Sequence, residues 1–281
     1  MKSFFRILTL IFIVFVLSHS AYAGGVIKMV YKDGDKMPLI AKKPNNSGAY
    51  LELFSKAAKK IGYKLEVLRM PKKRLHKQLA LGKVDFYPGA SFSKKRSRYL
   101  YYIENGLMTG EYGITGNNIP DIKSYKRVKN LKLKWLMELG SSKAEIAKSI
   151  GADVHLVNFV NIEKVRQFIN IGRKTFYVAD KELIDYYLQS TKYKSFKDAG
   201  LKVHKNCCGG EQPMHMGFSR FSPHFKEIPN PGYDKTKSIS PNNFPTLVDK
   251  KCVAYKLGKA LMELKESGET TKIYNKYFAK K

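Results

Sequence analysis

Apolar and polar positions alternate along the chain in a rhythm that is typical of mixed α/β proteins. Short apolar runs at 26–31, 64–70 and 84–87 predict strands. The segments 48–62 and 71–82 carry apolar residues at helical spacing and end at glycine, so they predict the helices between these strands. Because helices connect successive strands, this order predicts a parallel sheet with helices packed on its faces.

A second run of the same rhythm follows residues 99–130, where the alternation breaks and 107–115 reads as extended. Its short apolar runs predict strands at 131–137, 154–157, 175–179 and 201–204. Its amphipathic segments predict helices at 140–150, 162–172 and 182–188. A stretch rich in Pro, Asn and Gly at 227–251 predicts a long surface loop, and 253–268 and 270–278 predict two final helices.

The two runs predict either two lobes or one large domain, since the chain has a length at which single cores begin to divide. For two lobes, we expect the chain to cross near 108–114 and to return near 212–217. The first lobe would then comprise 24–110 plus 214–281, and the second would comprise 111–213.

Residues 1–23 have the features of a secretory signal peptide. Lys2 and Arg6 precede an almost wholly apolar run at 7–17, and Ala21-Tyr22-Ala23 fits the small-x-small cleavage pattern. The apolar run is shorter than the ~20 residues that a spanning helix needs. We therefore expect cleavage after Ala23 and a soluble protein in the periplasm, with an uncleaved membrane anchor as the alternative.

The chain is strongly basic, with 52 Lys and Arg against 23 Asp and Glu. One interpretation is attraction of acidic partners such as nucleic acid, anionic lipid or acidic solutes. The other is a solvated lysine surface, which the scatter of the lysines favours, because nucleic-acid binders usually cluster their basic residues or carry a recognisable module. We therefore expect no nucleic-acid partner.

Three cysteines are present, at Cys207, Cys208 and Cys252. Neighbouring cysteines rarely bond to each other because the local geometry is strained. In an oxidising compartment we therefore expect one disulfide from Cys207 or Cys208 to Cys252, which leaves one free thiol. No histidine or further cysteine stands at ligand spacing beside the vicinal pair, so we expect no metal site.

Polar residues follow several of the predicted strands, where ligands bind in open parallel sheets. The loop after 84–87 carries Gly89, Ser91 and Arg96, and a guanidinium can hold a carboxylate in bidentate fashion. Ser141 and Ser142 stand at a predicted helix N-terminus, where free N–H groups and the helix dipole favour anions. These residues together predict an anion site.

Two aspartates follow predicted strands in the same way, Asp180 in the second run and Asp33 in the first. A carboxylate beside the anion site would let the protein hold a zwitterion. Local roles are the alternatives: Ser141 and Asp180 as helix caps, and Arg96 as one of several surface cations.

The order of these segments resembles the family 3 periplasmic solute-binding proteins, the receptors of polar amino-acid ABC transporters. The resemblance covers nearly all of the chain after residue 23. It is carried by the segments 48–54, 79–85, 89–96, 140–142, 178–180 and 267–278. The segment 89–96 matches the family's Gly-x-Ser/Thr-x-Thr-x-x-Arg loop, with Ser93 in place of threonine.

The resemblance implies a two-lobed α/β fold of the type II periplasmic-binding-protein class, with a ligand cleft between the lobes. It implies that Arg96 clamps the ligand carboxylate, helped by Ser91 and by the turn at Ser142. The Gly89 carbonyl and the Asp180 carboxylate would then accept hydrogen bonds from the ligand ammonium.

Two departures from the family pattern bear on the ligand. The family's aromatic pair near the first strand is here Met37-Pro38-Leu39. The usual tryptophan before the second helix is missing, and Arg74 lies nearby. Arg74 is either a second cation in the cleft, which would suit an acidic ligand, or a surface arginine.

The resemblance implies a receptor that binds an amino acid or a similar small carboxylate-bearing solute and delivers it to an inner-membrane ABC permease. We expect a monomer with no cofactor and no catalytic residues. One alternative is an enzyme on the same scaffold, similar to cyclohexadienyl dehydratases, with Asp180 or Glu104 as acid or base. A sensor input and a binder of anionic envelope polymers are further alternatives.

Overall fold

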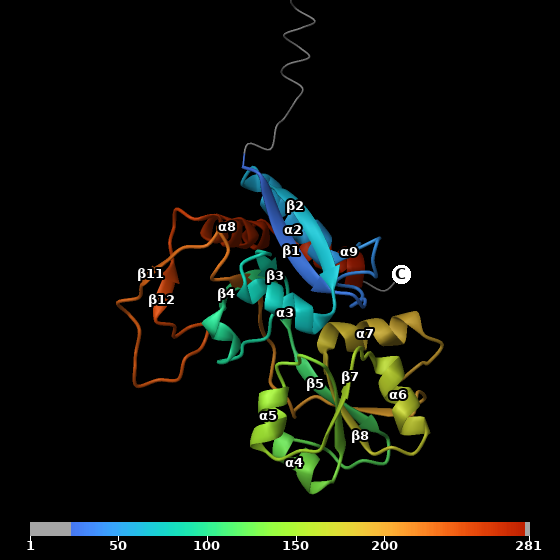
Figure 1. Ribbon diagram of the computed structural model, residues 1–281. Helices are drawn as coiled ribbons and strands as arrows, with labels where there is room; N and C mark the ends of the chain where they lie inside the picture. The colour runs from blue at the N-terminus through green and yellow to red at the C-terminus, as the bar shows by residue number, and fades with distance from the viewer. Residues whose placement is uncertain (1–23, 279–281) are drawn as a thin grey trace, which may run out of the picture.

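The computed structural model describes residues 24–278, which form two α/β lobes (Figure 1). Each lobe is built on a five-stranded sheet with helices packed on it, so the predicted two-lobed α/β fold is confirmed. The predicted signal peptide at 1–23 lies outside the described residues. Within 24–278, no helix is long and apolar enough to cross a membrane.

Five strands form the sheet of the first lobe. Across the sheet they are β2 (Lys64–Met70), β1 (Val26–Lys32), β3 (Phe86–Tyr87), β10 (Gln212–Ser219) and β4 (Leu100–Thr109). Strands β2, β1 and β3 run parallel, so their carboxyl ends reach the same edge. Strand β10 runs antiparallel to β3 and β4 and enters from a distant part of the chain.

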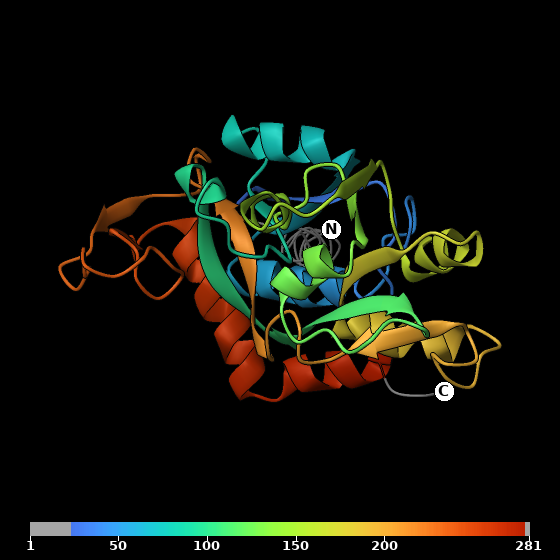
Figure 2. The same ribbon diagram turned by 90° about the horizontal axis from the view of Figure 1, so that it is seen from below.

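Four α-helices accompany this sheet in the described residues, and each buries one apolar face. They are α2 (Ala49–Lys60), α3 (Lys72–Ala80), α8 (Val253–Glu266) and α9 (Glu269–Phe278). Figure 2 shows α3 on one side of the molecule and the red pair α8 and α9 on the other. All four lie where the periodicity predicts helices, because their buried residues repeat at helical spacing.

The second lobe repeats this plan with another five strands. Across the sheet they are β7 (Val154–Val157), β6 (Lys134–Glu138), β8 (Thr175–Asp180), β5 (Glu111–Gly116) and β9 (Leu201–His204). Strands β7, β6 and β8 run parallel, and β5 runs antiparallel to β8 and β9. The helices of this lobe are α4 (Tyr125–Asn130), α5 (Ala144–Ser149), α6 (Ile162–Asn170) and α7 (Lys181–Ser190).

Two connections join the lobes. The chain passes from β4 to β5 through Gly110, and it returns from β9 to β10 through 205–211. The extended segment predicted at 107–115 is divided between β4 and β5, because β4 pairs with β10 in one sheet and β5 with β8 in the other. The lobe limits 24–110 plus 214–281 and 111–213 stay a prediction.

The loop predicted at 227–251 contains one short antiparallel pair, β11 (Glu227–Pro229) with β12 (Thr246–Val248). In both views this segment projects from the first lobe (Figure 1, Figure 2).

The expected disulfide to Cys252 is wrong. Cys207 and Cys208 bond to each other, and Cys252 is a buried free cysteine. The vicinal pair belongs to the same core cluster as Trp135 in the second lobe, whereas Cys252 belongs to the core of the first lobe. The two lobes therefore separate the residues that the sequence reasoning paired.

Asp85 anchors the strand that leads into the predicted binding loop. The Lys28 N–H donates to its Oδ2 at 2.7 Å, and the Ser222 hydroxyl donates to its Oδ1 at 2.5 Å. His224 lies 3.3 Å from the same carboxylate. Burial would raise the pKa of Asp85, but His224, Lys28 and Ser222 together hold that pKa below its ordinary value.

We expect Asp85→Asn to lower the free energy of unfolding by about 2–3 kcal/mol, because the buried carboxylate loses its charge-assisted hydrogen bonds. A depressed pKa stabilises the fold at pH values above the unfolded pKa, ~3.9, and this contribution is lost as the pH falls through the folded pKa. The variant should lack that acid-side loss. Urea titrations between pH 3 and pH 7 would measure both effects.

Asp153→Asn is the matched control, since the Asp153 carboxylate is exposed and meets Lys134 at 3.4 Å on the surface. Such a pair contributes about 0–1 kcal/mol. Equal stability of the two variants would contradict the anchoring role of Asp85.

Candidate functional site

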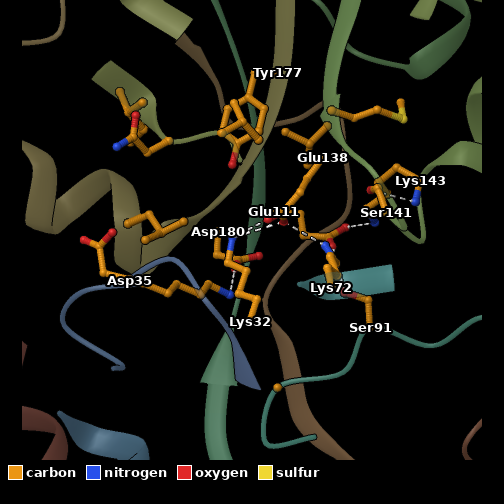
Figure 3. Close-up of a pocket in the computed structure, with 18 of the residues that line it drawn as sticks. Lys32, Asp35, Lys72, Ser91, Glu111, Glu138, Ser141, Lys143, Tyr177 and Asp180 are labelled. Atoms are coloured by element: carbon orange, nitrogen blue, oxygen red, sulfur yellow. Dashed lines mark hydrogen bonds and ion pairs between the residues drawn. The ribbon is translucent and has the colours of Figure 1, made fainter. Parts of the chain in front are cut away.

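A cavity of about 440 Å³ lies between the lobes and is lined by residues from both. The first lobe contributes the cations Lys32, Lys36, Lys72 and Arg96. The second lobe contributes the carboxylates Glu111, Glu138 and Asp180, together with Lys143. Figure 3 shows most of these side chains directed into one volume.

Several of these charged residues stand at the carboxyl ends of strands. Lys32 is the last residue of β1, Glu138 the last of β6 and Asp180 the last of β8. Each of these strands runs parallel to a neighbour in its own sheet. In each lobe, the last side chains of the parallel strands therefore lie at the same edge of the sheet. The two edges face each other across the cavity, as expected for ligand sites in open α/β sheets.

Arg96 is held at the start of a 3-10 turn, Arg96–Arg98, that follows β3. The Ser93 hydroxyl accepts from the Arg96 N–H at 3.3 Å, and the Ser93 N–H donates to the Tyr102 hydroxyl at 3.1 Å. The guanidinium Nη2 donates to the Gly140 carbonyl of the second lobe at 2.6 Å. Arg96 is 8% exposed, yet no carboxylate of residues 24–278 forms an ion pair with it.

Glu138 joins the lobes through two lysines. Its Oε2 lies 3.1 Å from Lys32 Nζ and 3.2 Å from Lys72 Nζ, and both lysines belong to the first lobe (Figure 3). Burial lowers the pKa of Lys72 to about 8, although Glu138 opposes that shift. Burial also lowers the pKa of Lys32.

The other two carboxylates each have one lysine. Asp180 pairs with Lys36 across the cleft, and Glu111 pairs with Lys143 within the second lobe. Burial would raise the pKa of Asp180, but Lys36 holds it below its ordinary value. Burial raises the pKa of Glu111, and Lys143 opposes that shift. Asp180 is therefore an ionised acceptor at neutral pH.

Most of the residues that the sequence predicted for the site line this cavity. They are Gly89, Ser91, Arg96, Ser142 and Asp180, and Ser141 lies beside them. The structure does not bring Arg74 to the cavity: it lies on α3 with an exposed side chain. Asp33 also lies outside the lining and pairs with Lys43 at 3.0 Å.

Sequence reasoning missed Lys32, Lys36, Lys72, Glu111 and Glu138. Lys32 and Glu138 could have been found, because each directly follows a predicted strand, as Asp180 does. The lysines were hidden among many similar residues in a chain with 52 Lys and Arg. Glu111 gives no local signal, since its position depends on the pairing of β5 with β8.

The aromatic contribution to the site also comes from unexpected positions. Met37 lines the cavity where the resembling family places an aromatic residue. Tyr31, Tyr87, Tyr177 and Trp135 line it instead, so the cavity combines charged groups with aromatic surface.

One contact between the lobes is possible because position 34 is a glycine. A Cβ built at Gly34 would overlap the ring of Phe159 in the second lobe. The Lys32 ammonium lies 5.2 Å from the centre of the same ring. Gly34 therefore lets the loop after β1 approach the second lobe closely.

The comparisons with known proteins agree with this architecture. The sequence model of the bacterial extracellular solute-binding proteins, family 3, matches residues 29–280. No curated protein matches the chain.

Solved structures with the same fold include an ancestral arginine-binding protein bound to arginine, at 22% identity and a TM-score of 0.61, covering 91% of this chain and 99% of that one. An ancestral amino acid-binding protein, a precursor of cyclohexadienyl dehydratase, is similar at 18% identity and a TM-score of 0.63, covering 90% and 95%. A histidine kinase sensor domain with similarity to periplasmic binding proteins matches at 16% identity and a TM-score of 0.63, covering 90% and 96%. At these identities the likeness shows the fold.

We expect the buried Lys72 to give the protein a pH-dependent stability. Between its folded pKa of about 8 and its ordinary value of 10.5, the unfolded chain holds a proton that the folded protein has released. The free energy of unfolding should therefore rise with pH in this range, by about 1–2 kcal/mol up to pH 10. Urea titrations of the wild type and of Lys72→Met should diverge in this way, and parallel pH profiles would contradict the assignment.

We expect Gly34→Val to separate the lobes, because the added side chain would occupy the volume of the Phe159 ring. Small-angle X-ray scattering should show a larger radius of gyration than for the wild type. The double variant Gly34→Val/Phe159→Ala removes the ring and should restore the compact value. An unchanged radius in the single variant would show that this contact does not control the approach of the lobes.

Proposed function

Because the chain belongs to the bacterial extracellular solute-binding proteins of family 3, we propose that it is a periplasmic receptor for an ABC importer. Its ligand is an amino acid or a similar small solute that carries a carboxylate. The ligand binds in the cavity between the lobes, and the loaded receptor docks on an inner-membrane permease. The protein works as a monomer without a cofactor, and it reaches the periplasm after cleavage of residues 1–23.

One observation carries this proposal: Arg96 is buried at the interlobe cavity without a carboxylate partner among the described residues. A buried guanidinium costs free energy unless it is paired and hydrogen-bonded. The Gly140 carbonyl satisfies one of its donors. A ligand carboxylate is the group that would complete the pairing, with Ser91 and the turn at Ser142 as additional donors.

The same site offers a reason for the lobes to close on a ligand. A solute that touches Arg96 from the first lobe and the 140–142 turn from the second makes its full set of contacts in the closed form alone. Such differential contact shifts the open–closed equilibrium toward closure. Transport and sensing both use this change, and a sensor domain shares the fold; we place the protein in transport.

The enzyme alternative needs a group that can deliver or remove a proton in the cavity. Asp180 has a pKa below its ordinary value and pairs with Lys36, which suits a fixed acceptor better than a general acid. Glu104 does not line the cavity. We therefore expect incubation with cyclohexadienyl acids to return them unchanged by mass spectrometry, and a dehydrated, decarboxylated product would overturn the receptor assignment.

We expect Arg96→Ala to abolish binding that calorimetry can detect, for any acid that a thermal-shift screen of amino acids and small organic acids identifies. Truncating one partner of a buried charge pair costs roughly 2–5 kcal/mol. Arg98→Ala is the matched control, because Arg98 lies two residues further along the same turn with an exposed side chain. Wild-type affinity in Arg96→Ala would remove Arg96 from the site.

The same measurement on Arg74→Ala decides whether the second predicted arginine contributes. Its exposed position on α3 leads us to expect wild-type affinity. A loss of affinity comparable to that of Arg96→Ala would place Arg74 in the closed cleft.

A further inference from the structure

Each carboxylate at the centre of the cavity already has an ammonium partner from this chain. Asp180 pairs with Lys36, Glu111 pairs with Lys143, and Glu138 pairs with both Lys32 and Lys72. Arg96 has no such partner among the described residues. Two more carboxylates line the cavity: Glu163 pairs with Arg166, and Asp35 has no ion pair among the described residues but carries an exposed side chain (Figure 3). Among the buried charges of the cavity, the one left for a ligand is therefore the positive charge of Arg96.

Lys36 reaches Asp180 from a fixed position in the backbone. Its N–H donates to the Ile40 carbonyl at 2.8 Å, and its own carbonyl accepts from the N–H groups of Leu39 and Ile40 at 2.8 and 3.1 Å. Leu39 and Ile40 are fully buried in the core of the first lobe. The turn 36–40 therefore holds the Lys36 side chain in the lining of the cavity, and its ammonium reaches Asp180 of the second lobe.

A ligand ammonium at Asp180 would have to displace that of Lys36. The exchange replaces one charge-assisted hydrogen bond with another and gains no new pairing. It would also leave the Lys36 ammonium, whose side chain is 15% exposed, next to the Lys32 ammonium without its carboxylate. Like charges brought together in a buried cleft repel each other, so the exchange is unfavourable.

From this geometry we infer that Lys36 supplies, from within the protein, the ammonium that an amino acid would bring to Asp180, and that the preferred ligand is a carboxylic acid without an α-ammonium group. The inference rests on the proposed receptor function. The acid group of the ligand binds Arg96, and its body lies against the aromatic surface of Tyr31, Tyr87, Tyr177 and Trp135. Lys36 thus contributes to ligand specificity and to the cross-lobe contact at once.

Matched pairs of acids test this directly, because each pair differs only in the α-ammonium. The probes are glutarate with glutamate, 3-phenylpropionate with phenylalanine, 6-aminohexanoate with lysine, and 5-guanidinopentanoate with arginine. Calorimetry and thermal shift on the wild-type protein should show that, in the pairs that bind, the acid without the ammonium binds at least ~10-fold more tightly than its amino-acid partner.

Two variants separate the role of Lys36 from general damage to the fold. Lys36→Met frees Asp180 and should raise the affinity for the amino acids at least ~10-fold. Lys202→Met is the matched control, since Lys202 pairs with the exposed Asp121 away from the cavity and should leave both affinities unchanged. If Lys36→Met does not fold, Lys36→Gln serves instead and should give the same gain, because a neutral amide does not neutralise Asp180.

The outcomes distinguish this inference from the receptor function on which it rests. If the wild type binds the amino acid of a pair as tightly as the acid without the ammonium, or more tightly, the inference is overturned and the receptor function stands. If no acid of either series binds the wild type or Lys36→Met, the proposed function fails and the inference fails with it.

Discussion

The structure depends on the pairing of charges that two lobes bury between them. Glu138, Asp180 and Glu111 lie in a cavity from which much of the solvent is excluded, and an unpaired carboxylate there would cost several kcal/mol. Lysines from the first lobe neutralise Glu138 and Asp180. The approach of the two lobes is therefore coupled to the ionisation of these groups, because separating the lobes exposes both partners of each cross-lobe pair to water.

In this arrangement, ion pairs connect the two lobes across the cleft. Cross-lobe ion pairs favour the closed form even before a ligand contributes, since each pair exists only when the lobes meet. Arg96 is the exception, because its cross-lobe partner is the neutral Gly140 carbonyl. In the receptor function proposed above, a solute carboxylate would pair with this arginine, and that contact would shift the open–closed equilibrium.

The fold explains why unrelated stretches of sequence converge at this point. Parallel strands place their last residues at one edge of each sheet, and the connections at Gly110 and 205–211 turn the two edges toward each other. The loop of Arg96 follows β3, which Asp85 fixes to β1 and to the chain after β10. The position of the Arg96 loop thus depends on a carboxylate that does not line the cavity.

The sequence by itself determined the α/β rhythm, the strand ends and the loop of Gly89, Ser91 and Arg96, because these follow from local periodicity and turn chemistry. It could not determine which charges pair, since the pairs Lys32–Glu138 and Lys36–Asp180 join residues more than a hundred positions apart. Tertiary structure decided those pairs, and it separated Cys252 from Cys208 by placing them in the cores of different lobes. Local sequence fixes what each side chain can do, and the closing of two lobes decides which partner it meets.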